Sequence, residues 1–144
     1  MVNPWDGVYM DVLDYQWAVA KEFWTEIDAL ARENNVGVAI EMHPHNLVFS
    51  PVTLKKLVDL VGATNIGAEM DPSHLMWQGM DVAACIRWLG PLVYVAAAKD
   101  AMITPGVDIR GVLDECAGTA LAQVGDDRRP GVAAARQLAR QRVG

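Results

Sequence analysis

Apolar residues recur every three or four positions over residues 17–34, and this spacing predicts an amphipathic helix. They form one stripe that consists of Ala20, Phe23, Trp24, Ile27, Leu30 and Ala31. We expect a second helix to begin at Ser50-Pro51 and to end at Gly62, because serine is a favoured N-cap, proline fits the first helical turn and glycine often ends a helix. A third helix is expected to begin after Asp81 and to end at Gly90.

Short apolar runs at residues 36–42, 65–71 and 92–98 predict buried strands. Strands and helices therefore alternate, which indicates an α/β protein with a parallel sheet and right-handed crossovers. We expect three βα units, or four if the short run at 109–113 forms another strand. The pattern decays from about residue 101, and residues 116–144 show only weak helical periodicity. We therefore divide the chain into a domain over 1–115 and an Ala/Arg-rich tail over 116–144.

Polar side chains gather on one face of the predicted sheet, at the carboxyl ends of its strands. Side chains alternate between the two faces of a strand, so Glu41 shares a face with His43, and Glu69 shares a face with Asp71. His74 follows one turn later. A buried strand holds carboxylates when they are paired, hydrogen-bonded or bound to a cation. These five residues therefore predict one pocket, and their oxygen and nitrogen donors suit Mn²⁺, Mg²⁺, Co²⁺ or Zn²⁺.

Simpler interpretations stay open for most of these residues. Asp71 is also a natural helix N-cap, since Pro72-Ser73 follows it, and His74 also fits an ordinary surface histidine. Glu41 is the hardest to explain without a site, because it lies in a strand among Val, Ile and Met. Simpler roles also suit three other side chains, which could be structural, solvent-facing or part of a pocket wall rather than functional: His43, His45 and Trp77.

Composition and charge narrow the function classes. The chain has 144 residues, 52% of them hydrophobic, which is enough for one domain with a core. Residues 1–127 carry 7 Lys and Arg against 18 Asp and Glu, and this acidic balance argues against a nucleic-acid groove. The last 17 residues carry five Arg and no acidic residue, which is typical of a solvated end.

Other sequence signals favour a cytoplasmic protein. Because no apolar run reaches about 18 residues, we expect no membrane span. The N-terminal MVNPWDG lacks the pattern of a signal peptide, and the two cysteines, Cys85 and Cys116, match no metal-ligand spacing.

Three motifs carry a resemblance to a known family: GVAIEMHP at 37–44, DPSHLMWQGMD at 71–81 and YVAAAKD at 94–100. Together they resemble the xylose isomerase-like sugar phosphate isomerases and epimerases. These are metal-dependent (β/α)₈ barrels, and their superfamily also includes an abasic-site endonuclease. The resemblance covers roughly residues 16–115. It implies a partial (β/α)₈ TIM barrel of three to four parallel βα units.

The resemblance also implies roles for individual residues. Glu41 is similar to a metal ligand that serves as a catalytic base, and Asp71 is similar to the second metal ligand. His74 is similar to a histidine that contacts substrate oxygens, or the metal in the endonuclease branch, and Lys99 matches a catalytic lysine. The implied reaction is proton transfer next to the carbonyl of a sugar or polyol, with a divalent metal polarising the oxygens. Three residues are expected to bind the substrate: His43, Glu69 and Trp77.

Two departures from the family bear on activity. The family places a histidine ligand two residues before the lysine, where this chain has Ala97, and a methyl group cannot coordinate a metal. The family's last glutamate ligand has no counterpart in this chain. The Ala/Arg/Gly-rich sequence after Glu115 is typical of a truncated or frameshifted reading frame. Two ligands of four would hold a metal weakly, so the resemblance does not ensure that the metal is retained.

Length adds a further constraint, because a closed barrel needs at least about 200 residues. An open fragment would leave sheet edges and an apolar face exposed. Three outcomes stay open: a half-barrel that pairs with itself, as a homo-oligomer, or with another chain; a compact, rearranged α/β sandwich; or an unstable remnant. Two functions stay open. One is a metal-dependent sugar (phosphate) isomerase or epimerase, impaired by Ala97 and the missing C-terminal part. The other is a catalytically inactive remnant that acts as a binding or interaction domain. An endonuclease is disfavoured, because that branch uses more histidines than the 3 present here.

Overall fold

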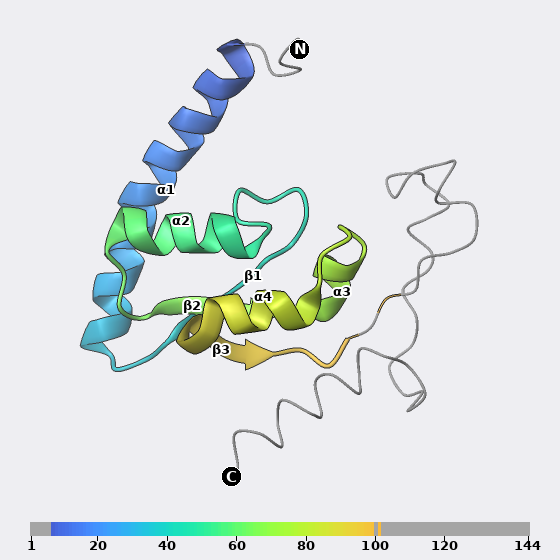
Figure 1. Cartoon of the computed structure of the whole chain (residues 1–144). Helices are drawn as coiled ribbons and strands as arrows, with labels where there is room; N and C mark the ends of the chain where they lie inside the picture. The colour runs from blue at the N-terminus through green and yellow to red at the C-terminus, as the bar shows by residue number, and fades with distance from the viewer. Residues whose placement is uncertain (1–6, 100, 102–144) are drawn as a thin grey trace.

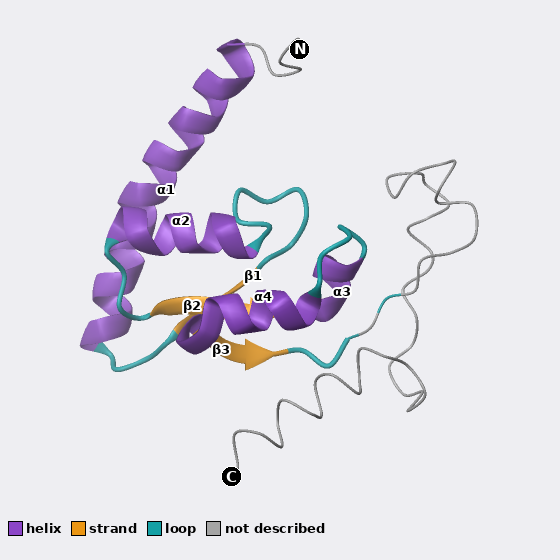
Figure 2. Ribbon diagram, viewed as in Figure 1, coloured by secondary structure: helices purple, strands orange, loops and turns teal. Residues whose placement is uncertain are grey.

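The computed structural model describes residues 7–99 and 101, in which helices pack against a parallel sheet (Figures 1 and 2). The elements are α1 (Gly7–Glu33), β1 (Val38–Glu41), α2 (Pro51–Val61), β2 (Ile66–Met70), α3 (Pro72–Met76), α4 (Val82–Leu89), η1 (Gly90–Leu92) and β3 (Val93–Ala96). The strand order is β1-β2-β3, and both pairs are parallel. This confirms the predicted α/β class. The predicted strand at 109–113 and the Ala/Arg-rich tail at 116–144 lie outside the described residues.

The predicted caps define α2 and α4. Ser50 Oγ accepts a hydrogen bond from Thr53 N, and Thr53 Oγ1 accepts one from Ser50 N, so the two residues form a capping box. Gly62 follows α2 with φ +67°, in the left-handed region that glycine tolerates. At the start of α4, Asp81 Oδ1 accepts a hydrogen bond of 2.9 Å from Ala84 N.

The first helix is longer than the sequence pattern predicts, because it begins at Gly7 rather than near residue 17. Two residues of the predicted apolar stripe, Phe23 and Leu30, are 54% and 57% exposed, so the stripe does not coincide with the buried side of the helix. Apolar residues occupy two neighbouring stripes of α1, and periodicity alone cannot tell which stripe meets the sheet. The side that turns inward carries Trp17, Trp24, Asp28 and Ala31.

The core lies on one face of the sheet. Ile66, Ala68 and Met70 of β2 are fully buried, and the last two pack with Leu54 and Leu57 of α2. Side chains alternate along a strand, so the residues between them emerge on the opposite face. That face carries the carboxylates, because Glu41 and Glu69 are partners in the β1–β2 register. The predicted sorting of apolar and acidic residues onto different faces is thus confirmed for these two strands.

A buried carboxylate ties α1 to the start of β2. Asp28 is 3% exposed, and its Oδ1 accepts hydrogen bonds of 3.0 Å from Thr64 N and 2.8 Å from Asn65 N. Its other oxygen lies 3.6 Å from Arg32 Nη2. A buried charge is tolerated when it is hydrogen-bonded and paired, and Asp28 meets both conditions. No local sequence pattern predicts this contact of Asp28.

Tyr94 crosses the face of the sheet that carries the carboxylates. The register between β2 and β3 shifts beside Ala68 and Glu69, which places Tyr94 in the irregularity. Its ring lies so close to Gly67 that a Cβ there would meet Tyr94 Cδ1 at 2.6 Å and Leu92 O at 2.5 Å. Glycine at position 67 is therefore a packing requirement of this close approach.

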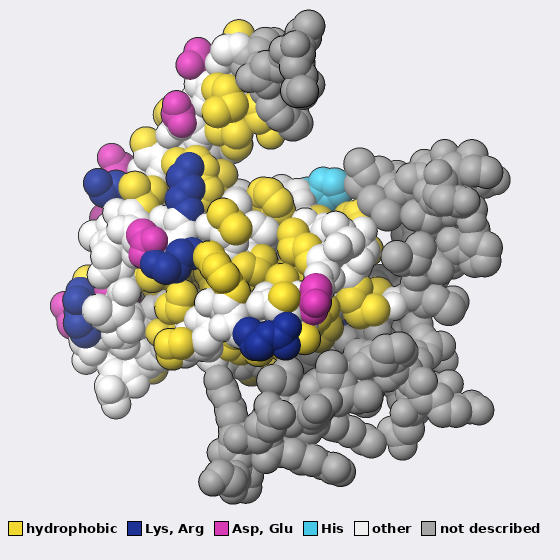
Figure 3. Space-filling view, in the orientation of Figure 1, with side chains coloured by type: hydrophobic (Ala, Val, Ile, Leu, Met, Phe, Trp, Pro, Cys, Tyr) yellow, Lys and Arg dark blue, Asp and Glu magenta, His cyan; other side chains and the backbone are white. Residues whose placement is uncertain are grey.

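The surface of α1 is partly apolar. Figure 3 shows hydrophobic side chains gathered on the part of α1 that projects beyond α2, where Val8, Val12 and Tyr15 are exposed. Within the described part of the chain, no helix is both long enough and apolar enough to cross a membrane.

Candidate metal centre

The two oxygens of Asp71 make different contacts. Oδ1 accepts hydrogen bonds of 3.0 Å from Ser73 N and 2.6 Å from Ser73 Oγ, so Asp71 is the N-cap of α3. Oδ2 is inaccessible to solvent and has no hydrogen bond of ordinary geometry with a described residue. It points instead at the Lys99 ammonium. The capping interpretation of Asp71 is confirmed, and it leaves the second oxygen available to a cation.

Glu41, Asp71 and His74 come together at the carboxyl end of β1 and β2. Asp71 follows β2 directly, and the first turn of α3 returns His74 to the same place. His74 Nε2 lies 3.2 Å from Glu41 Oε1 and 3.4 Å from Asp71 Oδ2. One ligand atom from each residue lies within 4.8 Å of the others. The three residues form a cluster of two carboxylates and one imidazole, which we call the acidic triad.

Lys99 supplies a positive charge to the acidic triad. Its Nζ lies 2.6 Å from Asp71 Oδ2 and 3.4 Å from Glu41 Oε1. The hydrogen bond with Asp71 is the main reason that the pKa of Lys99 is raised above its ordinary value of 10.5. Lys99 follows the end of β3 at Ala96, so a residue beyond this strand completes the cluster.

Opposing effects act on the pKa of Asp71. Burial alone raises it, because a buried carboxylate loses its hydration. Hydrogen bonds from Lys99 and Ser73, together with the charge of His74, outweigh burial and hold the pKa below its ordinary value of 3.8. Asp71 is therefore a carboxylate at neutral pH, as a metal ligand must be.

A second histidine packs against the acidic triad. The rings of His43 and His74 meet edge to face with their centroids 4.2 Å apart. His43 Nδ1 lies 2.6 Å from Pro44 O. Because a carbonyl oxygen can only accept, Nδ1 is the protonated nitrogen of this ring and donates a hydrogen bond to Pro44 O. The backbone of His74 is also fixed, since the Gln78 amide donates a hydrogen bond of 2.7 Å to His74 O. Gln78 was not singled out as a site residue, although it lies within the DPSHLMWQGMD motif.

The remaining predicted residues lie farther from the cluster. Glu69 is next to Glu41 in the sheet but contributes no ligand atom to the acidic triad. Trp77 follows α3, and its ring centroid lies 6.4 Å from that of His45. Ala97 N donates a hydrogen bond of 3.0 Å to Met70 O, which holds position 97 beside the end of β2.

The acidic triad fits a divalent metal. The fit rests on Asp71 Oδ2, a buried and charged oxygen that already faces a cation, the Lys99 ammonium 2.6 Å away. Oxygen and imidazole donors suit Mn²⁺, Co²⁺, Zn²⁺ or Mg²⁺. His74 provides a nitrogen donor although position 97 has none.

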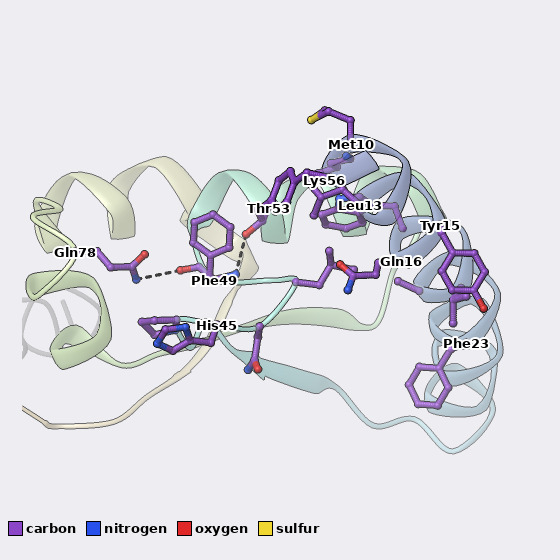
Figure 4. Close-up of a pocket in the computed structure, with 17 residues that line it drawn as sticks. Met10, Leu13, Tyr15, Gln16, Phe23, His45, Phe49, Thr53, Lys56 and Gln78 are labelled. Atoms are coloured by element: carbon purple, nitrogen blue, oxygen red, sulfur yellow. Dashed lines mark hydrogen bonds between the residues drawn. The ribbon is translucent and has the colours of Figure 1, made fainter. Parts of the chain in front are cut away.

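A separate groove of about 1080 Å³ lies between α1 and the loop that joins β1 to α2 (Figure 4). Met10, Leu13 and Gln16 of α1 line one side, and His45 and Phe49 line the other. No member of the acidic triad lines this groove, so it is distinct from the candidate metal centre.

Comparison with known proteins identifies the family. Residues 4–130 match the xylose isomerase-like TIM barrel family. The chain belongs to this family. The match extends beyond the 16–115 region that carries the motifs. The protein YfiH of Bacillus subtilis (strain 168), which is uncharacterized, is 38% identical over 101 residues, equal to 69% of this chain and 32% of YfiH.

A solved structure shows the same fold. The crystal structure of AsbF from Bacillus anthracis, a probable 3-DHS dehydratase involved in petrobactin synthesis, matches with a TM-score of 0.54 and 20% sequence identity. The match covers 74% of this chain and 37% of AsbF, and at this identity it shows the fold alone. The chain thus spans about a third of the length of both relatives. Its open three-stranded parallel sheet corresponds to part of a TIM barrel.

Proposed function

We propose that this chain is a metal-dependent domain that transfers a proton next to the carbonyl of a small sugar or polyol derivative, as isomerases and epimerases do. The observation that carries the proposal is the convergence of Glu41, Asp71 and His74, with ligand atoms within 4.8 Å of one another. Membership in the xylose isomerase-like family supports the same chemistry.

Asp71 and His74 would hold the divalent ion together with Glu41. When bound, the ion would polarise the carbonyl and hydroxyl oxygens of the substrate and so make the neighbouring C–H bond more acidic. Asp71 suits this position because Ser73 fixes Oδ1, whereas Oδ2 is directed at a cation, the Lys99 ammonium. The His43 ring packs against the His74 imidazole and so orients it before any ligand arrives, and Gln78 binds the backbone carbonyl of His74.

Glu41 is the proposed base. Its side chain is 36% exposed, whereas that of Asp71 is 1% exposed, so Glu41 is the carboxylate that a substrate can reach. Glu41 would take the proton from the carbon, and the C–H electron pair would form the C=C bond of an enediol-type intermediate while the C=O π electrons move onto the carbonyl oxygen. Return of the proton from Glu41 to the former carbonyl carbon, with the proton of the neighbouring hydroxyl passing to the former carbonyl oxygen, gives isomerisation. Epimerisation would need a second acid, such as water, to deliver a proton to the opposite face of the same carbon. Lys99 would orient a substrate oxygen. We also propose substrate contacts from His43, Glu69 and Trp77.

Ala97 favours a second function, a binding domain without turnover. A methyl group at this position leaves the acidic triad without a further imidazole. Such a domain would bind a metal and a sugar-like molecule but would exchange no substrate proton.

Proton exchange with solvent separates the two functions. The full chain would be loaded with Mn²⁺, incubated in D₂O with a panel of ketoses, aldoses and their phosphates, and then freed of metal for proton NMR. We expect deuterium to replace the proton next to the carbonyl of at least one compound, and we expect Glu41→Gln to abolish the exchange. Binding of a compound without exchange would support the binding domain. If Mn²⁺ itself does not bind, the proposed metal centre is wrong.

A further inference from the structure

Nitrogen atoms of Lys99 and His74 contact the same two oxygens of the candidate metal centre. Lys99 Nζ lies 2.6 Å from Asp71 Oδ2 and 3.4 Å from Glu41 Oε1. His74 Nε2 lies 3.4 Å and 3.2 Å from these same atoms. An ion bound by Glu41 and Asp71 would therefore compete with the Lys99 ammonium for these oxygens.

The charge of Lys99 stabilises the metal-free cluster. Asp71 is 2% exposed, and an ionised carboxylate at such a position is strongly unfavourable without a counter-charge. Among the described lysines and arginines, Lys99 makes the ion pairs to Asp71 and Glu41, whereas Lys55 and Arg32 pair with other carboxylates. Among these side chains, Lys99 thus supplies the positive charge that balances the two carboxylates.

We propose that Lys99 is the exchangeable counter-cation of the Glu41–Asp71 pair, and that a divalent ion binds by displacing its ammonium. The inference rests on the metal centre proposed above and assigns Lys99 a role that precedes any catalytic one. A divalent ion and an ammonium on the same oxygens repel each other strongly, because the site is partly buried. The Lys99 side chain is 48% exposed, so its flexible stem can carry the displaced charge into solvent.

This role makes Lys99 a determinant of metal affinity. Its ammonium lowers the affinity of the acidic triad for a divalent ion and stabilises the fold when no ion is bound. A neutral residue at position 99 should have the opposite effects, namely tighter metal binding and a less stable metal-free protein.

The test compares Lys99→Met with Lys99→Arg in the full chain, and Lys55→Met serves as the matched control. Lys55 pairs with Asp59 on the exposed side of α2, so its replacement removes an ion pair away from the acidic triad. Isothermal titration with Mn²⁺ gives the affinity, and thermal unfolding with EDTA or with Mn²⁺ gives the two melting temperatures. We expect Lys99→Met to bind Mn²⁺ about tenfold more tightly. Its melting temperature should fall in EDTA, while Lys99→Arg and Lys55→Met should bind Mn²⁺ like the unsubstituted chain.

The outcomes separate this inference from the proposed function. If the unsubstituted chain binds Mn²⁺ and Lys99→Met binds it no more tightly, the exchange is overturned and the metal centre stands. If every variant is folded and none binds Mn²⁺, the metal centre is wrong, and the exchange with it. If Lys99→Met and Lys99→Gln do not fold in EDTA, we expect Mn²⁺ to restore their folding. If Mn²⁺ does not restore it, the proposal that the ion replaces the Lys99 ammonium is overturned.

Discussion

The buried oxygen Oδ2 of Asp71 lies 2.6 Å from the ammonium of Lys99, while Oδ1 of the same carboxylate caps α3. One side chain therefore links the end of β2, the start of α3 and the segment that follows β3. Because the cap through Ser73 holds the carboxylate in place, its second oxygen remains directed at the cation. Asp71 has a structural and a candidate functional role at once, and each depends on a different oxygen.

The Asp71–Lys99 pair should make stability depend on pH at both extremes. The pKa of Asp71 is lowered by folding, so its contribution is present above its ordinary value of 3.8 and is lost as the pH falls through the folded pKa. The pKa of Lys99 is raised by folding, so its contribution is present below 10.5 and is lost as the pH rises through the folded pKa. Urea unfolding in EDTA should show a free-energy gap between the unsubstituted chain and Asp71→Asn that is constant between about pH 5 and pH 9. A gap that persists unchanged to about pH 2 would contradict the role of the pair.

Asp71→Asn and Asp71→Ala should separate capping from metal binding. Asparagine retains a side-chain oxygen that can accept from Ser73 N, whereas alanine has none. Asp71→Ala should therefore lose about 1 kcal/mol more stability than Asp71→Asn in EDTA, as measured by urea unfolding. Both variants should lose Mn²⁺ affinity, because neither supplies a carboxylate. Normal Mn²⁺ binding by Asp71→Asn would show that this carboxylate is not a ligand.

Neighbouring glutamates on one face of the sheet offer a matched test of the acidic triad. Glu41 contributes a ligand atom and its register partner Glu69 does not. Glu41→Gln should weaken Mn²⁺ binding at least about tenfold, since an amide oxygen is a poorer ligand than a carboxylate. Glu69→Gln removes the same charge one strand away and should leave the affinity within about twofold. Equal losses in a calorimetric titration would mean that net charge, rather than coordination, attracts the ion.

Local sequence signals predicted much of this fold and of the acidic triad. The cap at Ser50 and the stop at Gly62 depend on neighbouring residues, so they could be read directly from the sequence. The alternation of side chains placed Glu41 and Glu69 on one face, and β1 and β2 are regular enough to preserve that relation. The spacing of Asp71 and His74 needs only one helical turn to bring both to the same place.

Features that depend on distant partners could not be predicted in this way. The acceptor role of Asp28 involves backbone groups at Thr64 and Asn65, 36 and 37 residues away. The family resemblance assigned Lys99 a catalytic role, but β3 ends at Ala96, three residues before it. Its approach to Asp71 therefore depends on the path of the chain after the strand, and no periodicity describes that path.

Gly67 should tolerate no side chain. A Cβ at this position would lie 2.5 Å from Leu92 O and 2.6 Å from Tyr94 Cδ1, and the first of these atoms belongs to the backbone. We expect Gly67→Ala to lower the free energy of unfolding by about 1–3 kcal/mol in urea denaturation. Gly7→Ala is the control, because a Cβ there would meet nothing within 4 Å. Adding Tyr94→Ala should not restore the stability of Gly67→Ala, since the clash with Leu92 O would remain. Full recovery in the double variant would contradict this account.

Ala97→His should strengthen metal binding if the acidic triad is an otherwise intact centre. Position 97 lies beside the end of β2 through the hydrogen bond from Ala97 N to Met70 O, two residues before Lys99. An added imidazole there would supply the donor that the family resemblance places at this position. Residues that only orient metal ligands already contribute about 10–100-fold to metal affinity. A side chain that binds the metal directly should contribute no less, so Ala97→His should raise the Mn²⁺ affinity at least about tenfold. Ala98→His, one residue farther along, is the control for a histidine at a neighbouring position and should have little effect. Equal affinities of Ala97→His and the unsubstituted chain would show that position 97 does not face the ion, and the metal centre would then have to function with the acidic triad alone.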